Sequence, residues 1–254
     1  MPKFSIITAT YNAADTLDTC INSVRDQDVD VEHILIDGGS TDATLDIANT
    51  YKDNLSQIVS EPDQGIYDAM NKGIQMATGE VIGILNADDF YPSDKILSCI
   101  EEVFTDKNIE ACYGDLIYLD SKHTNKVKRY WRAGNFDHNK FYWGWMPPHP
   151  TFFVRSSIYE KYGLFNLDLG SAADYEIMLR FLLKHQIYIA YLPMVMVNMR
   201  MGGVSNASLS NRLAANRMDR KAWEVNDLHP YSWTLAAKPL RKIGQWGFKG
   251  NGER

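Results

Sequence analysis

The stretch Val-Ile-Gly-Ile-Leu-Asn-Ala-Asp-Asp occupies residues 81–89. Its first five residues carry no polar side chain on either face of an extended chain, which is typical of a central strand in a buried parallel sheet. The strand ends abruptly in Asn86-Ala87-Asp88-Asp89. Because ligands of open parallel sheets bind beyond the carboxyl ends of the strands, these side chains mark the edge at which a site is expected.

Strand-type runs alternate with helical patterns on the amino-terminal side of this stretch. The runs at 4–8, 33–36 and 58–59 predict strands, and the apolar repeats at 17–24, 44–51 and 67–78 predict helices. This alternation predicts an α/β fold with a mostly parallel central sheet flanked by helices.

The pattern changes beyond Phe104. Short alternating strands at 111–119 and 126–131 predict a small antiparallel appendage. A loop rich in Trp, Pro and His follows at 135–150. Further helices are expected near 156–162 and 174–185, before a last apolar segment at 187–197.

Composition indicates a globular protein. The chain has 254 residues, of which 45% are hydrophobic and 23% charged, with a formal net charge of −6, and this profile excludes disorder and collagen. The apolar segment 187–197 is shorter than the roughly 20 residues that a membrane span needs. The amino-terminal residues 1–12 have the pattern of a first strand rather than of a signal peptide, so we expect a cytoplasmic protein.

Charge is unevenly distributed along the chain. Residues 206–254 contain nine Lys or Arg against four Asp or Glu, so this segment carries +5 and residues 1–205 carry −11. We therefore expect one domain over 1–205 and a basic, helical C-terminal tail over 206–254. Its basic, aromatic and apolar side chains suit peripheral contact with the anionic inner face of the plasma membrane. The alternative is that the tail packs on its own body or on a second subunit of an oligomer.

Three polar clusters follow predicted strands, at 8–12, 37–42 and 86–89, and they are expected to converge. Neither a GxGxxG fingerprint nor a GxxxxGK[ST] loop is present, so phosphates must be held in another way. The adjacent carboxylates of Asp88 and Asp89 could bind a hard divalent cation that bridges to a pyrophosphate. The alternative is a solvated turn that caps the next helix.

Four segments carry a family resemblance. They are TATYN at 8–12, ILIDGGSTDAT at 34–44, EPDQGIYDAMNKGIQMATGEVIGILNADD at 61–89, and DYEIMLR at 174–180. Together they resemble the family 2 glycosyltransferases, which have the Rossmann-like GT-A fold, and the resemblance covers residues 3–205. It implies an inverting transfer, in which an acceptor hydroxyl attacks the anomeric carbon of a nucleotide-diphosphate sugar.

The resemblance also implies which residues bind the donor. They are Thr8, Ala9, Tyr11 and Asp37 at the ends of the first two strands, Asp63, Tyr67, Asp68 and Asn71 at the next helix, and Asn86, Ala87 and Asp88. Tyr11 could instead be a packing residue and Asp37 a turn residue, and Asp63 and Asp68 could serve a turn and a helix end. Common family members have Asp-Asp-Gly-Ser where this chain has Asp37-Gly38-Gly39-Ser40, so any role of Gly38 is a backbone role.

The family's DxD motif corresponds to Asn86-Ala87-Asp88, with an amide in place of the first acid. The resemblance therefore implies Asp88 as the leading ligand of Mg²⁺ or Mn²⁺, with Asp89 beside it. Asp174 matches the second acid of the family's Glu-Asp pair and is the expected general base, while Ala173 replaces the Glu. A plain helix cap at Asp174 is the alternative.

Other residues are candidates for the acceptor side or for a closing loop: His149, Trp145 and Arg200. Each also has a structural explanation. His149 could be a structural histidine of a rigid loop, Trp145 could fill the core, and Arg200 could form a surface ion pair. The expected partners are a nucleotide-sugar donor, UDP- or GDP-linked, and a hydroxyl of a glycan or polyprenyl-linked acceptor in bacterial surface polysaccharide synthesis. A catalytically silent nucleotide-sugar or glycan binding module is the second hypothesis, and a nucleic-acid protein is disfavoured because the body is acidic.

Overall fold

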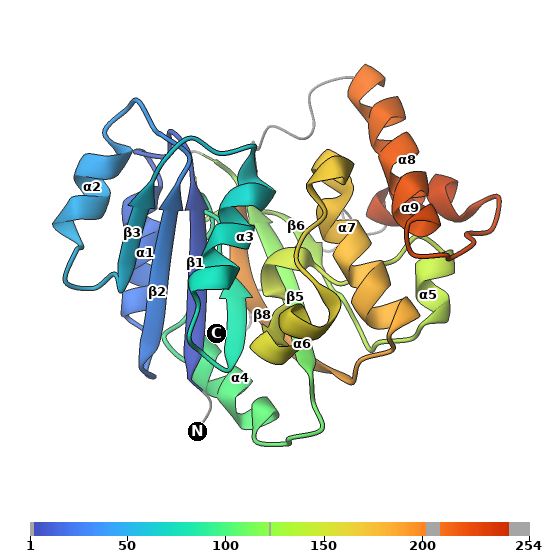
Figure 1. Ribbon diagram of the computed structural model, residues 1–254, viewed down its shortest axis with the longest axis horizontal. Helices are drawn as coiled ribbons and strands as arrows, with labels where there is room; N and C mark the ends of the chain where they lie inside the picture. The colour runs from blue at the N-terminus through green and yellow to red at the C-terminus, as the bar shows by residue number, and fades with distance from the viewer. Residues whose placement is uncertain (1–2, 122, 202–208, 244–254) are drawn as a thin grey trace.

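The computed structural model describes residues 3–121, 123–201 and 209–243. Four parallel strands form its amino-terminal half in the order β3-β2-β1-β4, namely β1 (Phe4–Thr10), β2 (Val31–Asp37), β3 (Gln57–Ser60) and β4 (Val81–Ile84) (Figure 1). Every residue of β4 is buried, as its all-apolar sequence predicts for a central strand. Because the four strands are parallel, their carboxyl ends lie at one edge.

The sheet continues into an antiparallel half. Strand β7 (Phe153–Arg155) joins β4 to β5 (Ala111–Leu119), antiparallel to both. Strand β5 then pairs antiparallel with β6 (Val127–Trp131) and parallel with β8 (Ile189–Arg200). The predicted α/β fold with a small antiparallel part is therefore confirmed, and the antiparallel strands extend the central sheet itself.

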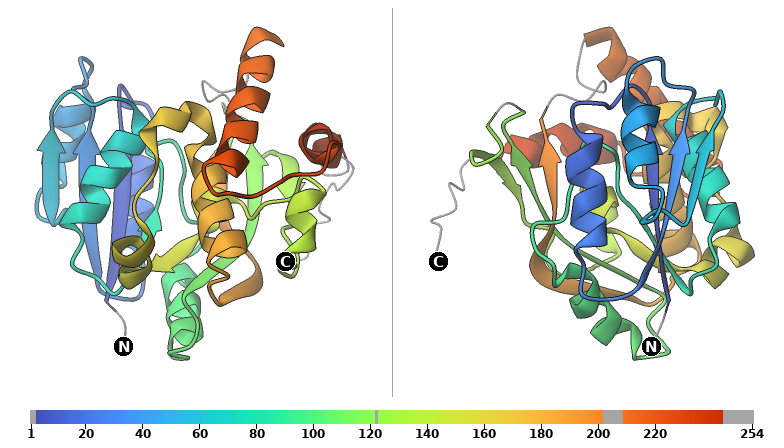
Figure 2. Two further views of the ribbon diagram at one scale, coloured as in Figure 1. Left: turned by 45° about the vertical axis from the view of Figure 1, so that its right-hand side comes forward. Right: turned by 90° about the vertical axis from the view of Figure 1, so that its left-hand side faces the viewer.

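Helices cover both faces of the parallel half. On β1, Ile7 and Ala9 face α3 (Ile66–Met76), whereas Phe4 and Ile6 pack with α1 (Leu17–Arg25) on the other face (Figure 2, right).

The remaining helices before the tail are α2 (Thr44–Thr50), α4 (Ile96–Phe104), α5 (Asn139–Tyr142), η1 (His149–Thr151), α6 (Ser156–Tyr162), η2 (Leu167–Ala172), α7 (Ala173–Met178) and η3 (Leu179–Lys184). The single helix predicted at 174–185 is thus α7 followed by a π-helical turn.

A glycine allows α3 to lie close to the sheet. A Cβ atom placed on Gly73 would lie 2.4 Å from Cγ2 of Ile7 on β1. Only a residue without a side chain fits at this distance, so Gly73 fixes the spacing between α3 and β1. The amino end of α3, which carries Tyr67 and Asp68, is thereby held beside the strand ends.

Two helices form the described part of the C-terminal tail, α8 (Leu209–Glu224) and α9 (Thr234–Ile243). Helix α8 lies beside α7 in both views of the molecule (Figure 1 and Figure 2, left). Trp223 is fully buried there, and Lys238 of α9 pairs with Asp219 at 2.7 Å. Residues 209–224 and 234–243 of the predicted tail are helical, and α8 contacts α7 of the body; residues 206–208 and 244–254 lie outside the described residues.

Candidate functional site

The loops that follow β1 and β2 hold each other. The backbone N–H of Asn12 donates to Oγ of Ser40 at 2.8 Å, and Oδ1 of Asn12 accepts from the backbone N–H of Thr41 at 2.8 Å. Asn12 has a φ of 48°, a left-handed conformation that asparagine tolerates better than most residues. The backbone N–H of Gly38 completes the brace with a 2.9 Å bond to the Thr10 carbonyl. The edge is therefore assembled before any ligand binds.

Asp37 organises this edge from inside. Its buried carboxylate accepts from the backbone N–H groups of Gly39 and Ser40 at 3.1 and 3.0 Å, and from the hydroxyl groups of Ser60 at 2.6 Å and of Ser40. Three of these four bonds go to Oδ2 and one goes to Oδ1. Of the two explanations open from the sequence, the contacts favour the turn residue.

The other residues expected on the first strand differ in their access. The Thr8 hydroxyl is buried 2.9 Å from Nε2 of His33, and Ala9 and Ala87 are core residues. The side chains of Thr8, Ala9 and Ala87 therefore support this edge of the sheet from the core. Tyr11 is 62% exposed, so its ring is available to a ligand.

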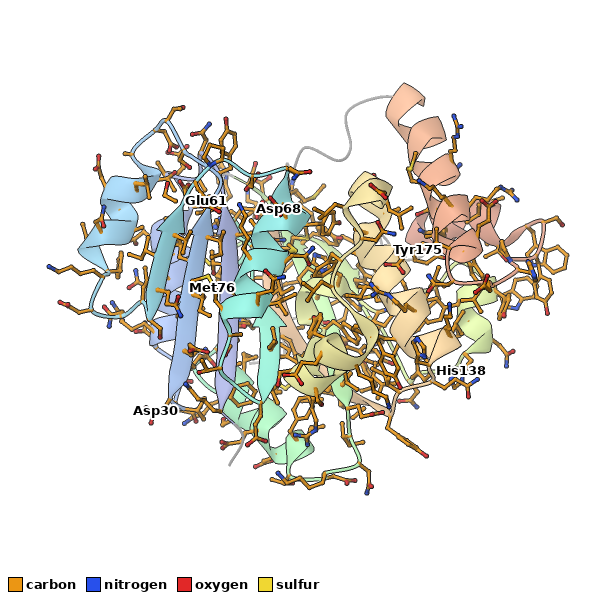
Figure 3. All side chains as sticks on the ribbon, viewed as in Figure 1. Asp30, Glu61, Asp68, Met76, His138 and Tyr175 are labelled. Carbon is orange, nitrogen blue, oxygen red and sulfur yellow. The ribbon has the colours of Figure 1, made fainter. Side chains whose placement is uncertain are left out.

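Asp63, which follows β3, lies next to the loop that begins at Asp37. A Cβ atom on Gly38 would lie 2.4 Å from Oδ2 of Asp63, so the carboxylate fills the space that a side chain at position 38 would take. Its Oδ1 accepts from the Gly65 backbone N–H at 2.8 Å. Figure 3 shows the neighbouring Glu61 near the carboxyl ends of β2 and β3, and Asp68 at the amino end of α3.

Buried oxygens without hydrogen-bond donors lie after β4. Asp89 is fully buried, and no well-formed hydrogen bond from a described residue reaches its carboxylate oxygens or Oδ1 of Asn86, although the Asn86 side chain and the Arg200 backbone N–H lie close enough to lower the pKa of Asp89. Burial raises the pKa of Asp89 well above its usual range, and the charge of Asp88 raises it further. Burial also raises the pKa of Asp88. These orphaned oxygens fit a hard cation, which would satisfy them and offset their charge.

A cation at this position would have few protein ligands. Within residues 3–121, 123–201 and 209–243, no three His, Cys, Asp or Glu side chains are placed to hold a metal ion together. Two carboxylates and an amide oxygen therefore form the set, which leaves coordination positions for water or phosphate oxygens, as is usual for Mg²⁺.

Arg200, at the end of β8, reaches this set from the other half of the sheet. Its guanidinium donates to the Asp88 carbonyl at 2.8 Å and lies 5.0 Å from the Phe90 ring centroid. Strand β8 meets the same loop through a bridge between Asn198 and Phe90. The positive charge of Arg200 is thus fixed beside both carboxylates, where it lowers their pKa values in opposition to burial.

Asp174 is the half-buried second residue of α7, and three side chains come to it. Burial raises the pKa of the Tyr67 phenol, and the charge of Asp174, its hydrogen-bond partner, raises it further. Burial lowers the pKa of His149, and Asp174 opposes this. Burial raises the pKa of Tyr118; Arg129 lowers it, and Asp89 and Asp174 both raise it. The carboxylates after β4 and on α7 therefore act on one phenol.

Two expected site residues have structural partners instead. Asn71 exchanges two 2.9 Å hydrogen bonds with the backbone of Phe165, which uses both ends of its amide. Trp145 is 5% exposed, and its indole N–H donates to the Ala133 carbonyl at 3.0 Å. The structure does not bring Trp145 to the site, because its ring packs among Tyr113, Phe136 and Phe141.

Helix α7 is fixed by buried polar contacts. Glu176 bonds to Arg180 and to Asn226 of the tail at 3.0 Å each. Arg180 in turn donates to the carbonyls of Tyr162 and Leu164 at 2.6 Å. Figure 3 shows Tyr175 between α7 and the tail helices. Asp174 therefore projects from a rigid element.

Two hollows, of about 470 and 640 Å³, lie at the opposite edge of the parallel strands. Both are lined by residues 28–31, at the amino end of β2. Because ligands of this architecture bind at the carboxyl ends, and these hollows contain no set of orphaned oxygens, we assign the site to the edge with Asp63 and Asp89.

Sequence analysis missed Tyr118 and the contact between Asp63 and Gly38. Tyr118 lies in an alternating strand, where its spacing resembles that of any packing aromatic. The contact joins loops that are distant in sequence, so no local pattern reveals it. In the sequence, only the glycine at position 38 indicated that another side chain could lie close to this loop.

The fold is that of the GT-A glycosyltransferases. The chain superposes on S. aureus TarS 1–349 in complex with UDP-GlcNAc with a TM-score of 0.67 at 18% identity, over 95% of this chain and 73% of that one. It superposes on the mannosyltransferase PcManGT from Pyrobaculum calidifontis, in complex with GDP-Man and Mn²⁺, with a TM-score of 0.65 at 19% identity, over 93% and 69%.

The sequence fits one family of that class. Residues 5–163 match the glycosyl transferase family 2, and the chain belongs to this family. A PGL/p-HBAD biosynthesis glycosyltransferase of Mycobacterium tuberculosis is 34% identical over 211 residues, which are 81% of this chain and 80% of that protein. Chondroitin synthase of Pasteurella multocida is 29% identical over 187 residues, 71% of this chain and 19% of that enzyme. The resemblance seen in the sequence is confirmed.

Among the described helices, none combines the length and the apolar character needed to cross a bilayer.

Proposed function

We propose that this family 2 glycosyltransferase is an inverting, metal-assisted enzyme that moves a sugar from a nucleotide diphosphate to a hydroxyl group. One observation carries the proposal. After β4, the buried oxygens of Asn86 and Asp89 have no well-formed hydrogen bond among the described residues, and the guanidinium of Arg200 from β8 donates to the Asp88 carbonyl at 2.8 Å beside them. Asp174 begins α7, so a candidate charge-stabilising set and a second carboxylate are available for the two charge requirements of the reaction.

The first requirement is stabilisation of the leaving diphosphate. Asp88, Asp89 and Asn86 would hold the divalent cation, which supplies positive charge to the departing phosphate oxygens. Arg200 adds a fixed positive charge at the same loop through its bond to the Asp88 carbonyl. Positive charge already in position where negative charge develops is usually a large catalytic contribution.

The second requirement is removal of the acceptor proton. Asp174 lies in the first turn of α7 and would serve as the general base. It takes the proton as the hydroxyl oxygen bonds to the anomeric carbon and the bond from that carbon to the diphosphate oxygen breaks. Attack from the face opposite the diphosphate inverts the configuration. Tyr67, the hydrogen-bond partner of Asp174, would orient it.

The identities of donor and acceptor rest on the relatives. The structural neighbours bind UDP-GlcNAc and GDP-Man, which supports a UDP- or GDP-linked donor. Similarity to a chondroitin synthase supports a glycan acceptor, free or linked to a polyprenyl lipid, as in bacterial surface polysaccharide synthesis.

A donor panel tests the function. UDP- and GDP-sugars are screened with Mn²⁺ for thermal stabilisation, and stabilising donors are assayed for sugar transfer with and without Asp174→Asn. We expect the variant to bind donor normally and to lose turnover about 10²- to 10⁴-fold, the usual contribution of a general base. Asp168→Asn, at an exposed acid of η2, is the matched control. Tight donor binding by the wild type with no transfer to any acceptor would instead indicate the silent binding module.

We propose in addition that the enzyme touches an anionic membrane through an aromatic patch, which consists of Trp143, Tyr231 and Trp233. These rings are 56%, 51% and 47% exposed. Trp233 stacks between the others, with centroids 5.9 Å from Trp143 and 4.9 Å from Tyr231. Exposed Trp and Tyr suit the bilayer interface, and the patch adjoins the tail of charge +5.

Vesicle sedimentation tests this contact. Deletion of the tail is a poor test, because it would strip the buried Trp223 from the body. We expect Trp143→Ser with Trp233→Ser to lower binding to vesicles that contain phosphatidylglycerol, and Tyr188→Ser, at a 69% exposed ring elsewhere, to leave it unchanged. Equal binding by all forms would refute the membrane contact.

A further inference from the structure

The aromatic patch is built from two segments that are distant in sequence. Trp143 directly follows α5, whereas Tyr231 and Trp233 lie in the connection between α8 and α9. The segments are joined where the Thr234 hydroxyl donates to the Tyr142 carbonyl at 2.8 Å, and where the rings of Trp143 and Trp233 meet. The patch is therefore complete only while the tail is docked on the body.

Gly144 receives helix α9 on the body side. A Cβ atom at this position would lie 2.5 Å from the backbone nitrogen of Lys238, and the φ of Gly144 is 73°, a conformation that favours glycine. The backbone of α9 thus lies directly on the loop that carries Trp143. Docking of α9 on this loop determines whether the two halves of the patch meet.

The same docked tail holds the helix of the expected base. The Trp223 indole donates to the Tyr175 hydroxyl at 2.9 Å. The ammonium group of Lys238 lies 3.5 Å from the Tyr175 ring centroid while it pairs with Asp219 at 2.7 Å. Tyr175 directly follows Asp174 on α7. One arrangement of the tail therefore completes the patch and anchors the residue next to the base.

Tyr142 connects the patch to this anchor. Its ring centroid lies 5.0 Å from that of Tyr231 and 5.1 Å from that of Trp223. Aromatic rings at such separations attract one another, so the contacts run without a break from Tyr231 to Tyr175. Figure 1 shows α5, α8 and α9 on the side of the molecule opposite α2. Separation of the tail from the body would break the patch and the anchor together.

We propose that an anionic membrane bound at the aromatic patch stabilises the docked tail and thereby holds Asp174 in place for transfer. The coupling rests on the proposed membrane contact and glycosyltransferase function, and it adds a regulation of the same site. A membrane that covers all three rings binds the complete patch better than its separated halves, and a ligand shifts an equilibrium toward the state that it binds better. Because such coupling is reciprocal, firmer docking also strengthens vesicle binding.

Rescue by vesicles tests the coupling. Trp223→Phe removes the donor to Tyr175 and weakens docking, and kcat is measured on a water-soluble acceptor, so that vesicles cannot act by concentrating a lipid-linked one. Coupling between two sites usually amounts to about 5- to 150-fold. We expect vesicles that contain phosphatidylglycerol to raise the kcat of Trp223→Phe at least about fivefold, and that of the wild type less. Lys238→Gln, which weakens the same docking with little change in volume, should respond like Trp223→Phe.

Further substitutions assign the rescue to the patch. Trp223→Phe combined with Trp143→Ser and Trp233→Ser should gain nothing from vesicles. Trp223→Phe combined with Tyr188→Ser, at a 69% exposed ring elsewhere, should keep the full gain.

Hydrogen exchange provides a readout that needs no transfer. Backbone amides of a helix exchange faster when the contacts that hold it open more often. Vesicles should slow exchange in α7 and α8 of Trp223→Phe, and this protection should disappear when the patch is removed. Helix α2, on the other side of the molecule, is the internal control and should exchange at the same rate with and without vesicles.

The outcomes separate the coupling from the functions on which it rests. Vesicles that bind the protein but leave kcat and α7 exchange of Trp223→Phe unchanged overturn the coupling, and leave the membrane contact and the transfer intact. A Trp223→Phe protein with the kcat and the α7 exchange of the wild type overturns it as well. Protection of α7 by vesicles in a protein that never transfers sugar supports the coupling and overturns the catalytic function.

Discussion

The indole N–H of Trp223 donates a 2.9 Å hydrogen bond to the hydroxyl of Tyr175, and both side chains are buried. Tyr175 directly follows Asp174, so the tail is anchored one residue from the expected base. The ammonium group of Lys238 lies 3.5 Å from the Tyr175 ring centroid and adds a second anchor. These contacts come from residues beyond 163, where the family match ends. The acceptor side therefore depends on a part of the chain that the family match does not cover.

Trp223→Phe should destabilise the protein and slow transfer. The substitution keeps an aromatic ring but leaves the buried Tyr175 hydroxyl without its donor, which costs about 1–3 kcal/mol. We expect the loss in urea-induced unfolding, together with lower kcat and unchanged donor affinity, because Trp223 contacts Tyr175 and Tyr142 rather than the loops after β1–β4 that are expected to bind the donor. Trp233→Phe, at a 47% exposed ring, is the control and should change stability by no more than about 0.5 kcal/mol. An unaltered kcat in Trp223→Phe would contradict the positioning role.

Asp88→Ala should nearly abolish transfer with the fold intact. Asp88 is half-buried and belongs to the set that would hold the cation, so its loss removes charge where the diphosphate departs. Transfer is measured against Mn²⁺ concentration, with Asp94→Ala, at an exposed acid beyond the loop, as control. Full Mn²⁺-dependent turnover in Asp88→Ala would exclude Asp88 as a ligand.

His33 should make stability depend on pH. Burial lowers its pKa from 6.5 to about 3 in the folded protein. Below about pH 6.5 the unfolded chain takes up a proton that the folded protein does not, so stability is complete above this pH and falls as the pH is lowered toward 3. The slope reaches at most about 1.4 kcal/mol per pH unit.

Urea-induced unfolding between pH 7.5 and 4.5 measures this slope. His33→Gln removes the titrating group, so its stability should fall less steeply than that of the wild type. His138→Gln, at an exposed histidine, should follow the wild type. A constant difference between wild type and His33→Gln across the range would show that His33 does not titrate in this way.

Gly73→Ala should destabilise the protein although alanine favours helices. The gain in helix propensity is about 1 kcal/mol. The new Cβ atom would lie 2.4 Å from Ile7 on β1, and such overpacking costs about 1–3 kcal/mol. Gln75→Ala, on the exposed side of α3, provides the comparison in thermal unfolding. A Gly73→Ala protein more stable than the wild type would mean that α3 moves away from the sheet freely.

The sequence was sufficient for those parts of the fold in which local pattern and packing agree. Strand β4 is apolar throughout and is central, and α6 spans the predicted residues 156–162. Strand β7 was not predicted, because three residues show no periodicity and its existence depends on β4 and β5 on either side. The π-helical turn η3 likewise follows from packing that no helical repeat records.

The candidate site divides in the same way. The convergence of the polar clusters at 8–12, 37–42 and 86–89 could be predicted, because a parallel sheet brings the carboxyl ends of its strands to one edge whatever the loop sequences are. The partner of each side chain was not evident. Asp37 is used by its own loop and Asn71 by Phe165, whereas Oδ2 of Asp63 has no donor among the described residues. Such contacts join residues far apart in the chain and require coordinates.

The anchor between Tyr175 and Trp223 also sets an order of events during translation. The two residues are 48 positions apart, so the ribosome adds Trp223 roughly 2 to 10 seconds after Tyr175. The parallel half, built from β1 to β4, has left the ribosome well before then. If the proposed function holds, we expect a nascent chain to become able to transfer sugar only after Trp223 has emerged and docked.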